Sequence, residues 1–257
     1  MENRPERVLI TGASSGLGRA LAEAYASREG AVVGAVARRA DLLDDLAREH
    51  AAIQPLAADV TDAPAMETLI ARFALEAGGL DLVIANAGVG QKSADDAWDP
   101  DTSRRIVEVN IRGVTNTIVP AIPIMIEQGR GRLVGISSLA GQTPLPASAA
   151  YGASKAWLVF YLESLALDLE PHGVNCTAVM PGHIPTPMVD GQGAPLVNPG
   201  ARRAAERIVR GIDRGERIIR FPWKVATLTR LAAWAPRSFK ANLQRRRLAK
   251  RKSRRGA

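Results

Sequence analysis

A tyrosine and a lysine four residues apart are the side chains in this sequence best placed to do chemistry. Tyr151 and Lys155 occur in Tyr-Gly-Ala-Ser-Lys, a helical segment in which this spacing places both on one face. A phenol has an ordinary pKa of about 10, and a neighbouring ammonium favours its ionised form. The pair could therefore exchange a proton with a carbonyl or alcohol oxygen. Taken singly, the same residues could be a packing tyrosine and a solvated lysine.

A glycine-rich turn near the start of the chain could hold a nucleotide. Thr11-Gly12-Ala13-Ser14-Ser15-Gly16-Leu17-Gly18 follows a short apolar run and leads into residues 19–25, which have helical spacing. Glycines let the backbone turn sharply and let a pyrophosphate approach the N–H groups at a helix start, where the helix dipole favours negative charge. A tight strand-to-helix connection without a ligand is the alternative.

These two motifs are part of a longer ordered set. The set continues with Asn86-Ala87-Gly88 after an apolar strand, Asn110 in the next helix, Ser138 at a strand end 13 residues before Tyr151, and Pro181-Gly182-His183-Ile184-Pro185-Thr186. The sequence therefore resembles the short-chain dehydrogenase/reductase family, specifically its short single-domain branch with TGxxxGxG and YxxxK motifs. The resemblance covers about residues 7 to 220 and leaves the C-terminal stretch unexplained.

The resemblance implies a role for four catalytic residues. Tyr151 would protonate the developing alkoxide during carbonyl reduction, or deprotonate the alcohol in reverse. Ser138 would hydrogen-bond the substrate oxygen and stabilise its developing charge. Lys155 would bind the nicotinamide ribose and lower the pKa of the tyrosine, and Asn110 would position a water that relays protons to Lys155. The hydride would come from the cofactor. As structural alternatives, Ser138 could cap a strand end and Asn110 could be a helix-kink amide.

The predicted cofactor contacts lie in the segments that come directly after the expected strands in the sequence. Thr186 would contact the nicotinamide carboxamide, whereas His183 in the same segment has no assigned role. Asn86 lies where small neighbours let a ribose approach the backbone, although its amide could instead tie adjacent strands together. Besides Tyr151 and Lys155, the full set is Gly12, Ser14, Ser15, Gly16, Leu17, Gly18, Arg38, Arg39, Asp59, Val60, Asn86, Ala87, Gly88, Pro181, Gly182, Ile184 and Thr186.

Two arginines favour NADP(H) over NAD(H) as the cofactor. In dinucleotide-binding folds an acid about 20 residues after the glycine turn binds the ribose 2′-hydroxyl, whereas an arginine there accommodates a 2′-phosphate. Arg38 occupies the position twenty residues beyond Gly18, Arg39 follows it, and no acid occurs before Asp41. A guanidinium can meet a phosphate where a carboxylate would repel it. The alternative is two solvated arginines that open a surface helix.

The Asp59-Val60 pair has two interpretations of equal weight. It follows the third expected strand and resembles the family's adenine-contacting pair. Asp59 could instead help to cap the helix that begins beyond residue 61, where Pro64 suits a first turn.

Short, nearly continuous apolar runs alternate with helical patterns along the chain. The apolar runs at 7–11, 31–36, 53–57, 80–85, 132–137 and 173–179 predict strands buried on both faces, with a seventh near 217–220. Helices are predicted at 16–29, 40–49, 63–77, 101–127 and 151–170, the fourth kinked or ended early by Pro120 and Pro123. This order predicts an α/β fold: a Rossmann-like, doubly wound, mostly parallel sheet of about seven strands with helices on both faces. Residues 181–200, rich in glycine and proline, predict a mobile loop beside the site.

Length and composition narrow the class of protein. The chain of 257 residues suits one large domain, and we expect a catalytic domain over 1–220 and an apolar, basic helical extension over 221–257. The single cysteine, Cys176, excludes an internal disulfide framework and is expected in a buried strand. The charged start and the lack of an uninterrupted apolar run of about 18 residues predict a cytoplasmic protein. Without clustered cysteines or acids, no metal site is expected.

The positive charge is concentrated at the C-terminus. Of the net charge of +8, residues 237–257 contribute ten Lys or Arg and no acid, so residues 1–236 sum to −2. Residues 221–257 could rest on anionic lipid or close over an apolar substrate, or the terminus could be solvated and frayed. No recognition module for a specific nucleic acid is present in the sequence.

The sequence as a whole predicts an NADP(H)-dependent oxidoreductase that acts on a hydrophobic ketone, aldehyde or secondary alcohol. A non-catalytic nucleotide-binding scaffold, and a peripheral membrane protein that acts through its basic tail, are the alternatives. We expect a small-molecule substrate and a homodimer or homotetramer.

Overall fold

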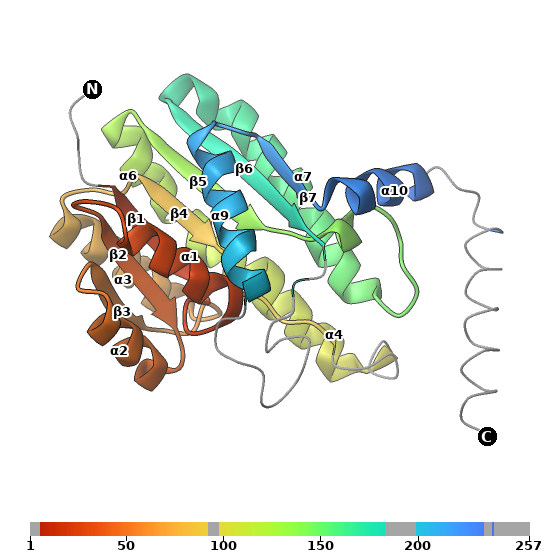
Figure 1. The fold of residues 1–257 in the computed structure, drawn as a ribbon, viewed down its shortest axis with the longest axis horizontal. Coiled ribbons are helices and arrows are strands. Elements are labelled where there is room, and N and C mark those ends of the chain that lie inside the picture. Colours follow the sequence, from red (N-terminus) through yellow and green to blue (C-terminus); the bar gives the residue numbers. More distant parts are fainter. Residues whose placement is uncertain (1–5, 92–97, 183, 185–198, 234–237, 239–257) are drawn as a thin grey trace.

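Seven parallel strands form one sheet at the centre of the molecule (Figure 1). The computed structural model describes residues 6–91, 98–182, 184, 199–233 and 238. The strand order is β3-β2-β1-β4-β5-β6-β7, and every neighbouring pair is parallel. The strands are β1 Arg7–Thr11, β2 Val32–Ala37, β3 Ile53–Ala57, β4 Leu82–Ala85, β5 Gly131–Ile136, β6 Val174–Pro181 and β7 Ile218–Phe221. The predicted doubly wound α/β fold is confirmed.

Helices cover both faces of the sheet because each central strand is apolar on both sides. Val8 and Ile10 of β1 belong to one core cluster, and Leu9 between them belongs to the other. The first cluster packs under α1 Gly16–Ala26, α2 Ala40–Glu49 and α9 Pro199–Asp213. The second packs under α3 Ala63–Ala77, α5 Gly113–Ile118, α6 Ala121–Gln128 and α7 Ala149–Leu169. These two layers place the carboxyl ends of the strands at one rim, where the strand order reverses between β1 and β4.

The predicted helix at 101–127 is divided into several parts. It consists of α4 Pro100–Val107, a π-helical turn at Glu108–Arg112, then α5 and α6. Pro120 precedes the first residue of α6, so the expected break at this proline is confirmed. The described stretch Pro100–Gln128 is long and apolar enough to cross a membrane, yet it is broken at this proline.

Helix α9 was not predicted from the sequence. Its buried residues Ala201, Ala204, Ala205, Ile208 and Ile212 recur at helical spacing and face α1. Because three of the five are alanines, the apolar stripe is weak in sequence. After β7 the chain forms α10 Trp223–Ala233, which extends away from the edge of the sheet (Figure 1). The predicted loop at 181–200 lies mostly outside the described residues, since only 181, 182, 184, 199 and 200 of it are described.

Candidate active site

The glycine turn joins β1 to α1 and leaves the start of the helix open. Gly12 and Gly16 have φ values of +70° and +59°, a left-handed conformation that favours glycine. A Cβ atom on Gly18 would overlap the carbonyl oxygen of Gly12, so the helix begins directly against the turn. Ser15, the residue before α1, makes no capping hydrogen bond with its side chain. The first N–H groups of a helix have no partner within it, so Gly16, Leu17 and Gly18 can donate to a phosphate.

Asn86 ties the end of β4 to this turn. Its Nδ2 donates to Thr11 O at 2.9 Å and to Gly12 O at 3.3 Å. In return, Thr11 Oγ1 accepts from the backbone N–H groups of Asn86 at 3.1 Å and Ala87 at 3.2 Å. A Cβ on Gly12 would lie 2.9 Å from Ala87 Cα, so no side chain fits between the two segments. The strand-tying role that the sequence left open for Asn86 is therefore present.

Arg39, and not Arg38, reaches the glycine turn. Arg39 Nη2 donates to Ser14 Oγ and Ser15 Oγ, both at 2.8 Å. Arg38 is 73% exposed, and its Nη1 lies 3.6 Å from Asp59 Oδ2. The two guanidiniums thus have different partners, and only that of Arg39 lies at the open start of α1.

Asp59 lies at the end of β3 and does not cap the next helix. The cap of α3 is Asp62, whose carboxylate accepts from Ala65 N at 3.1 Å. Asp59 Oδ1 instead accepts from the backbone N–H and the hydroxyl of Thr61, both at 2.9 Å. Burial disfavours ionisation of Asp59, but the Thr61 hydrogen bonds and the charge of Arg38 outweigh it and lower its pKa. Asp59 is therefore a carboxylate at the same rim as the turn.

Val60 and Gly182, two further predicted cofactor contacts, each make a backbone hydrogen bond within the protein. Val60 is buried, and its carbonyl accepts from Asn116 Nδ2 at 2.9 Å. Gly182, directly after β6, donates its N–H to Phe221 O at 2.7 Å. Ile184 packs against the core under α1 and α9. Thr186 lies outside the described residues, as does His183.

Tyr151, Ser138 and Lys155 come together where α7 meets the end of β5. The Ser138 side chain lies beside the Tyr151 hydroxyl and lowers the pKa of the phenol. Ser138 itself precedes a 3₁₀ turn, and its Oγ accepts from Ala140 N at 3.1 Å. Lys155 Nζ donates to Ile136 O at 2.8 Å and lies 5.8 Å from the centre of the Tyr151 ring. The predicted phenol, hydroxyl and ammonium therefore share one site.

Burial sets the pKa values of this pair. Desolvation lowers the pKa of Lys155 to about 8, because no carboxylate among the described residues compensates its buried charge. Desolvation also raises the pKa of Tyr151, and the nearby Ser138 side chain offsets only part of this effect. The expected fall in the Tyr151 pKa is therefore wrong for this structure. The ammonium faces a backbone carbonyl and the ring, rather than the phenol oxygen.

Asn110 lies in the π-helical turn and joins the loop after β4 to α7. Its Oδ1 accepts from Val89 N at 2.8 Å, and its Nδ2 donates to Val89 O at 3.0 Å and to Ser154 Oγ at 3.1 Å. Ser154 Oγ then donates to Tyr151 O at 2.8 Å. Asn110 therefore lies at an irregular turn of the helix, as the structural alternative for this residue expected. Such π-helical turns are frequent at functional sites, so this position is also compatible with a role in the reaction.

Gly88 brings Asn110 and Lys155 to a common point. A Cβ on Gly88 would lie 3.3 Å from Asn110 Oδ1 and 3.4 Å from Lys155 Nζ. A second glycine, Gly90, approaches the ring of Tyr151, since a Cβ there would lie 3.8 Å from Cδ2 and Cε2. Small residues at these positions leave the site open to a ligand that lies against the backbone.

Two serines that the sequence analysis did not single out hold α7 in place. Ser154 bonds Asn110 and Tyr151, as described above, and Ser137 Oγ donates to Lys155 O at 2.6 Å. Both are buried. Each lies next to a residue of the predicted set, so their position in the motifs was the available signal.

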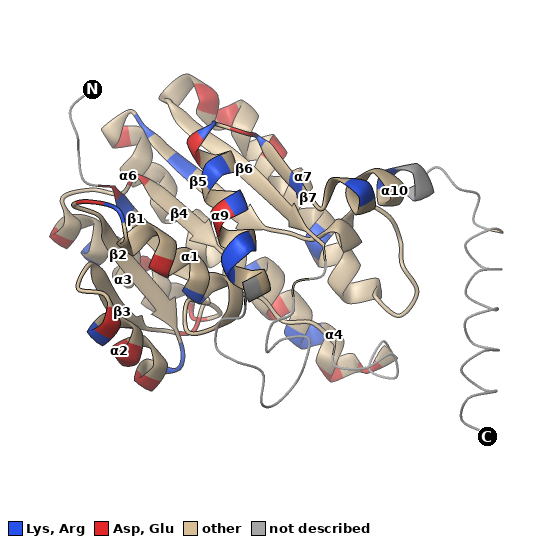
Figure 2. Ribbon diagram, in the orientation of Figure 1, with Lys and Arg blue, Asp and Glu red and all other residues tan. Residues whose placement is uncertain are grey.

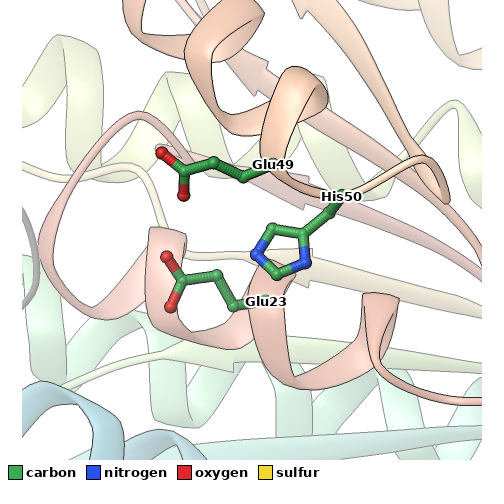
Figure 3. Close-up of side chains that lie close together, drawn as sticks. All are labelled: Glu23, Glu49 and His50. Atoms are coloured by element: carbon green, nitrogen blue, oxygen red, sulfur yellow. The ribbon is translucent and has the colours of Figure 1, made fainter.

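A group of potential metal ligands lies outside this site, on α1 and at the end of α2. Glu23, Glu49 and His50 have ligand atoms within 4.8 Å of one another (Figure 3). Arg19 accounts for the approach of the two acids, because its Nε donates to Glu23 at 3.0 Å and its Nη2 to Glu49 at 2.6 Å. The cluster arises from residues far apart in sequence, so no local spacing could predict it. With a cation already paired to both acids, it gives no reason to propose a metal.

A phenol, a serine hydroxyl and a buried amine beside an open helix start can exchange a proton with an oxygen held near a dinucleotide. Comparison with known proteins agrees with this chemistry. The family model for short chain dehydrogenases matches residues 6–195. The chain belongs to this family, whose members are NAD(P)-dependent oxidoreductases that act on CH–OH or C=O groups.

Individual relatives cover nearly the whole chain. An uncharacterized oxidoreductase from Myxococcus xanthus is 41% identical over 233 residues, which are 89% of this chain and 92% of that protein. A short chain dehydrogenase from Burkholderia cenocepacia, solved in complex with NADP, has a TM-score of 0.79 and 26% identity over 95% of this chain and 99% of its own. A short chain dehydrogenase/reductase from Burkholderia phymatum, solved in complex with NAD, has a TM-score of 0.78 and 26% identity over 95% and 96%.

Proposed function

We propose that this protein is an NADP(H)-dependent oxidoreductase that interconverts a hydrophobic ketone or aldehyde and the corresponding alcohol, with Tyr151 as the general acid and base. The observation that carries the proposal is the approach of the Ser138 side chain to the Tyr151 hydroxyl beside the buried amine of Lys155. When bound, the nicotinamide supplies or accepts the hydride.

The proposed roles follow from the contacts of each residue. The Tyr151 and Ser138 hydroxyls, which lie next to each other, would both donate to the oxygen of a bound carbonyl. Tyr151 then transfers its proton to that oxygen as negative charge develops, or takes it back from the alcohol. Lys155 and Asn110 border Gly88, so Lys155 would bind the ribose there. We retain the proposal that Asn110 positions a water for proton relay to Lys155.

Two glycines with no room for a side chain, and a helix start without a cap, support the proposed binding site for the dinucleotide. Cβ atoms on Gly12 and Gly18 would collide with the facing backbone, and the start of α1 is left uncapped. Gly16, Leu17 and Gly18 would hold the pyrophosphate, and Asp59 with Val60 would contact the adenine. Arg39, seated on Ser14 and Ser15, would bind a 2′-phosphate, which NAD(H) lacks. The contacts proposed for Ala87, Pro181, Gly182, Ile184 and Thr186 extend the same site toward the nicotinamide.

A hydrophobic substrate suits the rim next to Tyr151. Gln91 Nε2 donates to Ala147 O, which joins the segment after Gly90 to the loop before α7. In that loop Leu145 is a large apolar residue with 43% of its surface exposed. An apolar substrate would cover Leu145 and stabilise the complex by removing this surface from water.

The remaining proposals concern the whole protein. Residues 1–220 would form the catalytic domain and 221–257 an extension, in a cytoplasmic homodimer or homotetramer. The non-catalytic scaffold is not favoured, because Asn110, Ser138, Tyr151 and Lys155 are all retained and meet at one site.

The test is a panel of ketones, aldehydes and secondary alcohols, each followed by cofactor absorbance with NADPH and with NADH. We expect turnover of an apolar member of the panel, with NADPH the better cofactor. No turnover of any member while NADPH binds would favour the scaffold. Equal use of the two cofactors would contradict the proposed role of the arginines.

A further inference from the structure

Helix α10, which follows the edge strand β7, presents exposed apolar side chains at one edge of the sheet. In α10, Trp223 is 70% exposed and Leu228 is 67% exposed. The helix is fixed to the body of the protein by Ala226, which is buried, and by Thr229, whose Oγ1 accepts from the Gln142 side-chain amide at 2.7 Å. The exposed side chains therefore lie on a helix that is fixed to the protein, and Lys224 Nζ lies 5.7 Å from the centre of the Trp223 ring.

A recess of about 300 Å³ lies between α7, β7 and α10. Apolar side chains on its wall include Val159, Phe160 and Met180, and Phe160 is 75% exposed. Arg220 of β7 and Arg230 of α10 also line the recess. Trp223 is two helical turns before Arg230. The Phe160 ring and two guanidiniums therefore line one opening, and Trp223 lies on the same side of α10 as Arg230.

The recess is positively charged. Burial and the nearby charge of Arg230 lower the pKa of Arg220, so the two guanidiniums repel each other. Glu163 is the one acidic residue in the lining. No Asp or Glu follows Glu216 in the sequence, and Figure 2 shows basic residues without acids on α10. An anion in the recess would relieve the repulsion between the arginines.

The positive charge and the exposed apolar side chains of this surface together favour one kind of partner over the others. A second copy that met this surface about a two-fold axis would bring arginines against arginines. A nucleic acid would meet the charge but offers no apolar phase for Leu228. An anionic bilayer meets both needs, because its phosphates bind cations and its interface accepts Trp, Phe and Leu side chains.

We propose that α10 and the Arg220–Arg230 recess seat the protein on an anionic phospholipid surface, with a headgroup phosphate in the recess and the Phe160 and Trp223 rings in the interface. This surface is separate from the catalytic residues. Membrane binding and turnover can therefore fail independently of each other.

The test is co-sedimentation of the full chain with phosphatidylglycerol–phosphatidylcholine vesicles and with phosphatidylcholine vesicles alone. The protein should bind the anionic vesicles, more weakly as salt rises, and not the neutral ones. The double variant Arg220→Gln/Arg230→Gln should raise the half-saturating lipid concentration about thirtyfold, the equivalent of about 1 kcal/mol for each of two charges. The double variant Phe160→Ala/Trp223→Ala should raise it about tenfold, since two rings leave the interface.

Matched controls carry the same changes elsewhere. Arg202→Gln/Arg203→Gln removes two exposed arginines of α9, and Trp98→Ala removes a 90% exposed tryptophan before α4. Both should bind vesicles as the unchanged protein does, and all variants should keep their turnover. Equal binding to neutral vesicles, or unchanged binding by both test variants, would overturn the proposal. So would a change in oligomeric mass without a change in vesicle binding, or tighter binding to duplex DNA than to the vesicles.

Discussion

Replacing Arg39 by alanine should reduce the preference for NADPH over NADH. Its Nη2 lies 2.8 Å from the hydroxyls of Ser14 and Ser15, which holds the guanidinium at the open start of α1, where we propose that it binds the 2′-phosphate. A hydrogen bond to a charged group contributes about 1.5–3 kcal/mol, which corresponds to roughly 10- to 150-fold. Because Arg39 is exposed, screening by solvent places the effect at the lower end. We expect kcat/KM for NADPH to fall about tenfold and kcat/KM for NADH to stay unchanged.

The assay compares kcat/KM for both cofactors in three variants. Arg38→Ala should have the smaller effect, because Arg38 is 73% exposed and lies beside Asp59. Arg48→Ala removes an equally exposed arginine of α2 that pairs with Asp45, and so controls for the loss of one positive charge. An unchanged NADPH-to-NADH ratio in Arg39→Ala, or a larger change in Arg38→Ala, would refute the assignment.

Three further predictions concern the catalytic residues. Asn110→Ala breaks three hydrogen bonds and should lower the free energy of unfolding by about 3 kcal/mol, against about 1 kcal/mol for Asn116→Ala, which breaks one; equal melting temperatures for the two variants would contradict this. The Lys155 pKa of about 8 lies below its unfolded value, so the unfolded state binds more protons above that pH, and the contribution of Lys155 to stability should rise as pH increases from about 8 to 10. Denaturant unfolding should show that this rise is absent in Lys155→Met, and its persistence there would exclude Lys155 as the cause. Gly88→Ala places a methyl group 3.3 Å from Asn110 Oδ1 and should weaken NADPH binding, measured by fluorescence titration, with little change in melting temperature; unchanged affinity would argue against ribose binding there.

The sheet could be predicted because its strands are buried on both faces. A run such as Val8-Leu9-Ile10 is apolar throughout, whereas a surface helix has polar residues at the positions that face water. Helix α9 escaped detection because much of its buried stripe is alanine, which is common on exposed helices as well. Local apolar pattern therefore predicts the centre of this fold better than its outer layer.

The candidate site could be predicted as a set of residues but not as a set of contacts. Tyr151 and Lys155 do share a helix face, yet the partner of the amine is the Ile136 carbonyl, which no spacing rule identifies. The choice of Arg39 over Arg38 depends on which way each side chain leaves the end of β2. Burial raises the pKa of Tyr151, and burial is a property of the packed molecule rather than of the motif.

The central claim is that the Tyr151 hydroxyl transfers the proton. The most direct measurement is the rate of NADPH oxidation with a ketone substrate in Tyr151→Phe, with cofactor affinity determined in parallel. Phenylalanine keeps the ring beside Lys155 and removes only the hydroxyl next to Ser138. We predict a rate lower by about a hundredfold to ten-thousandfold with NADPH binding retained. An unchanged rate would contradict the assignment.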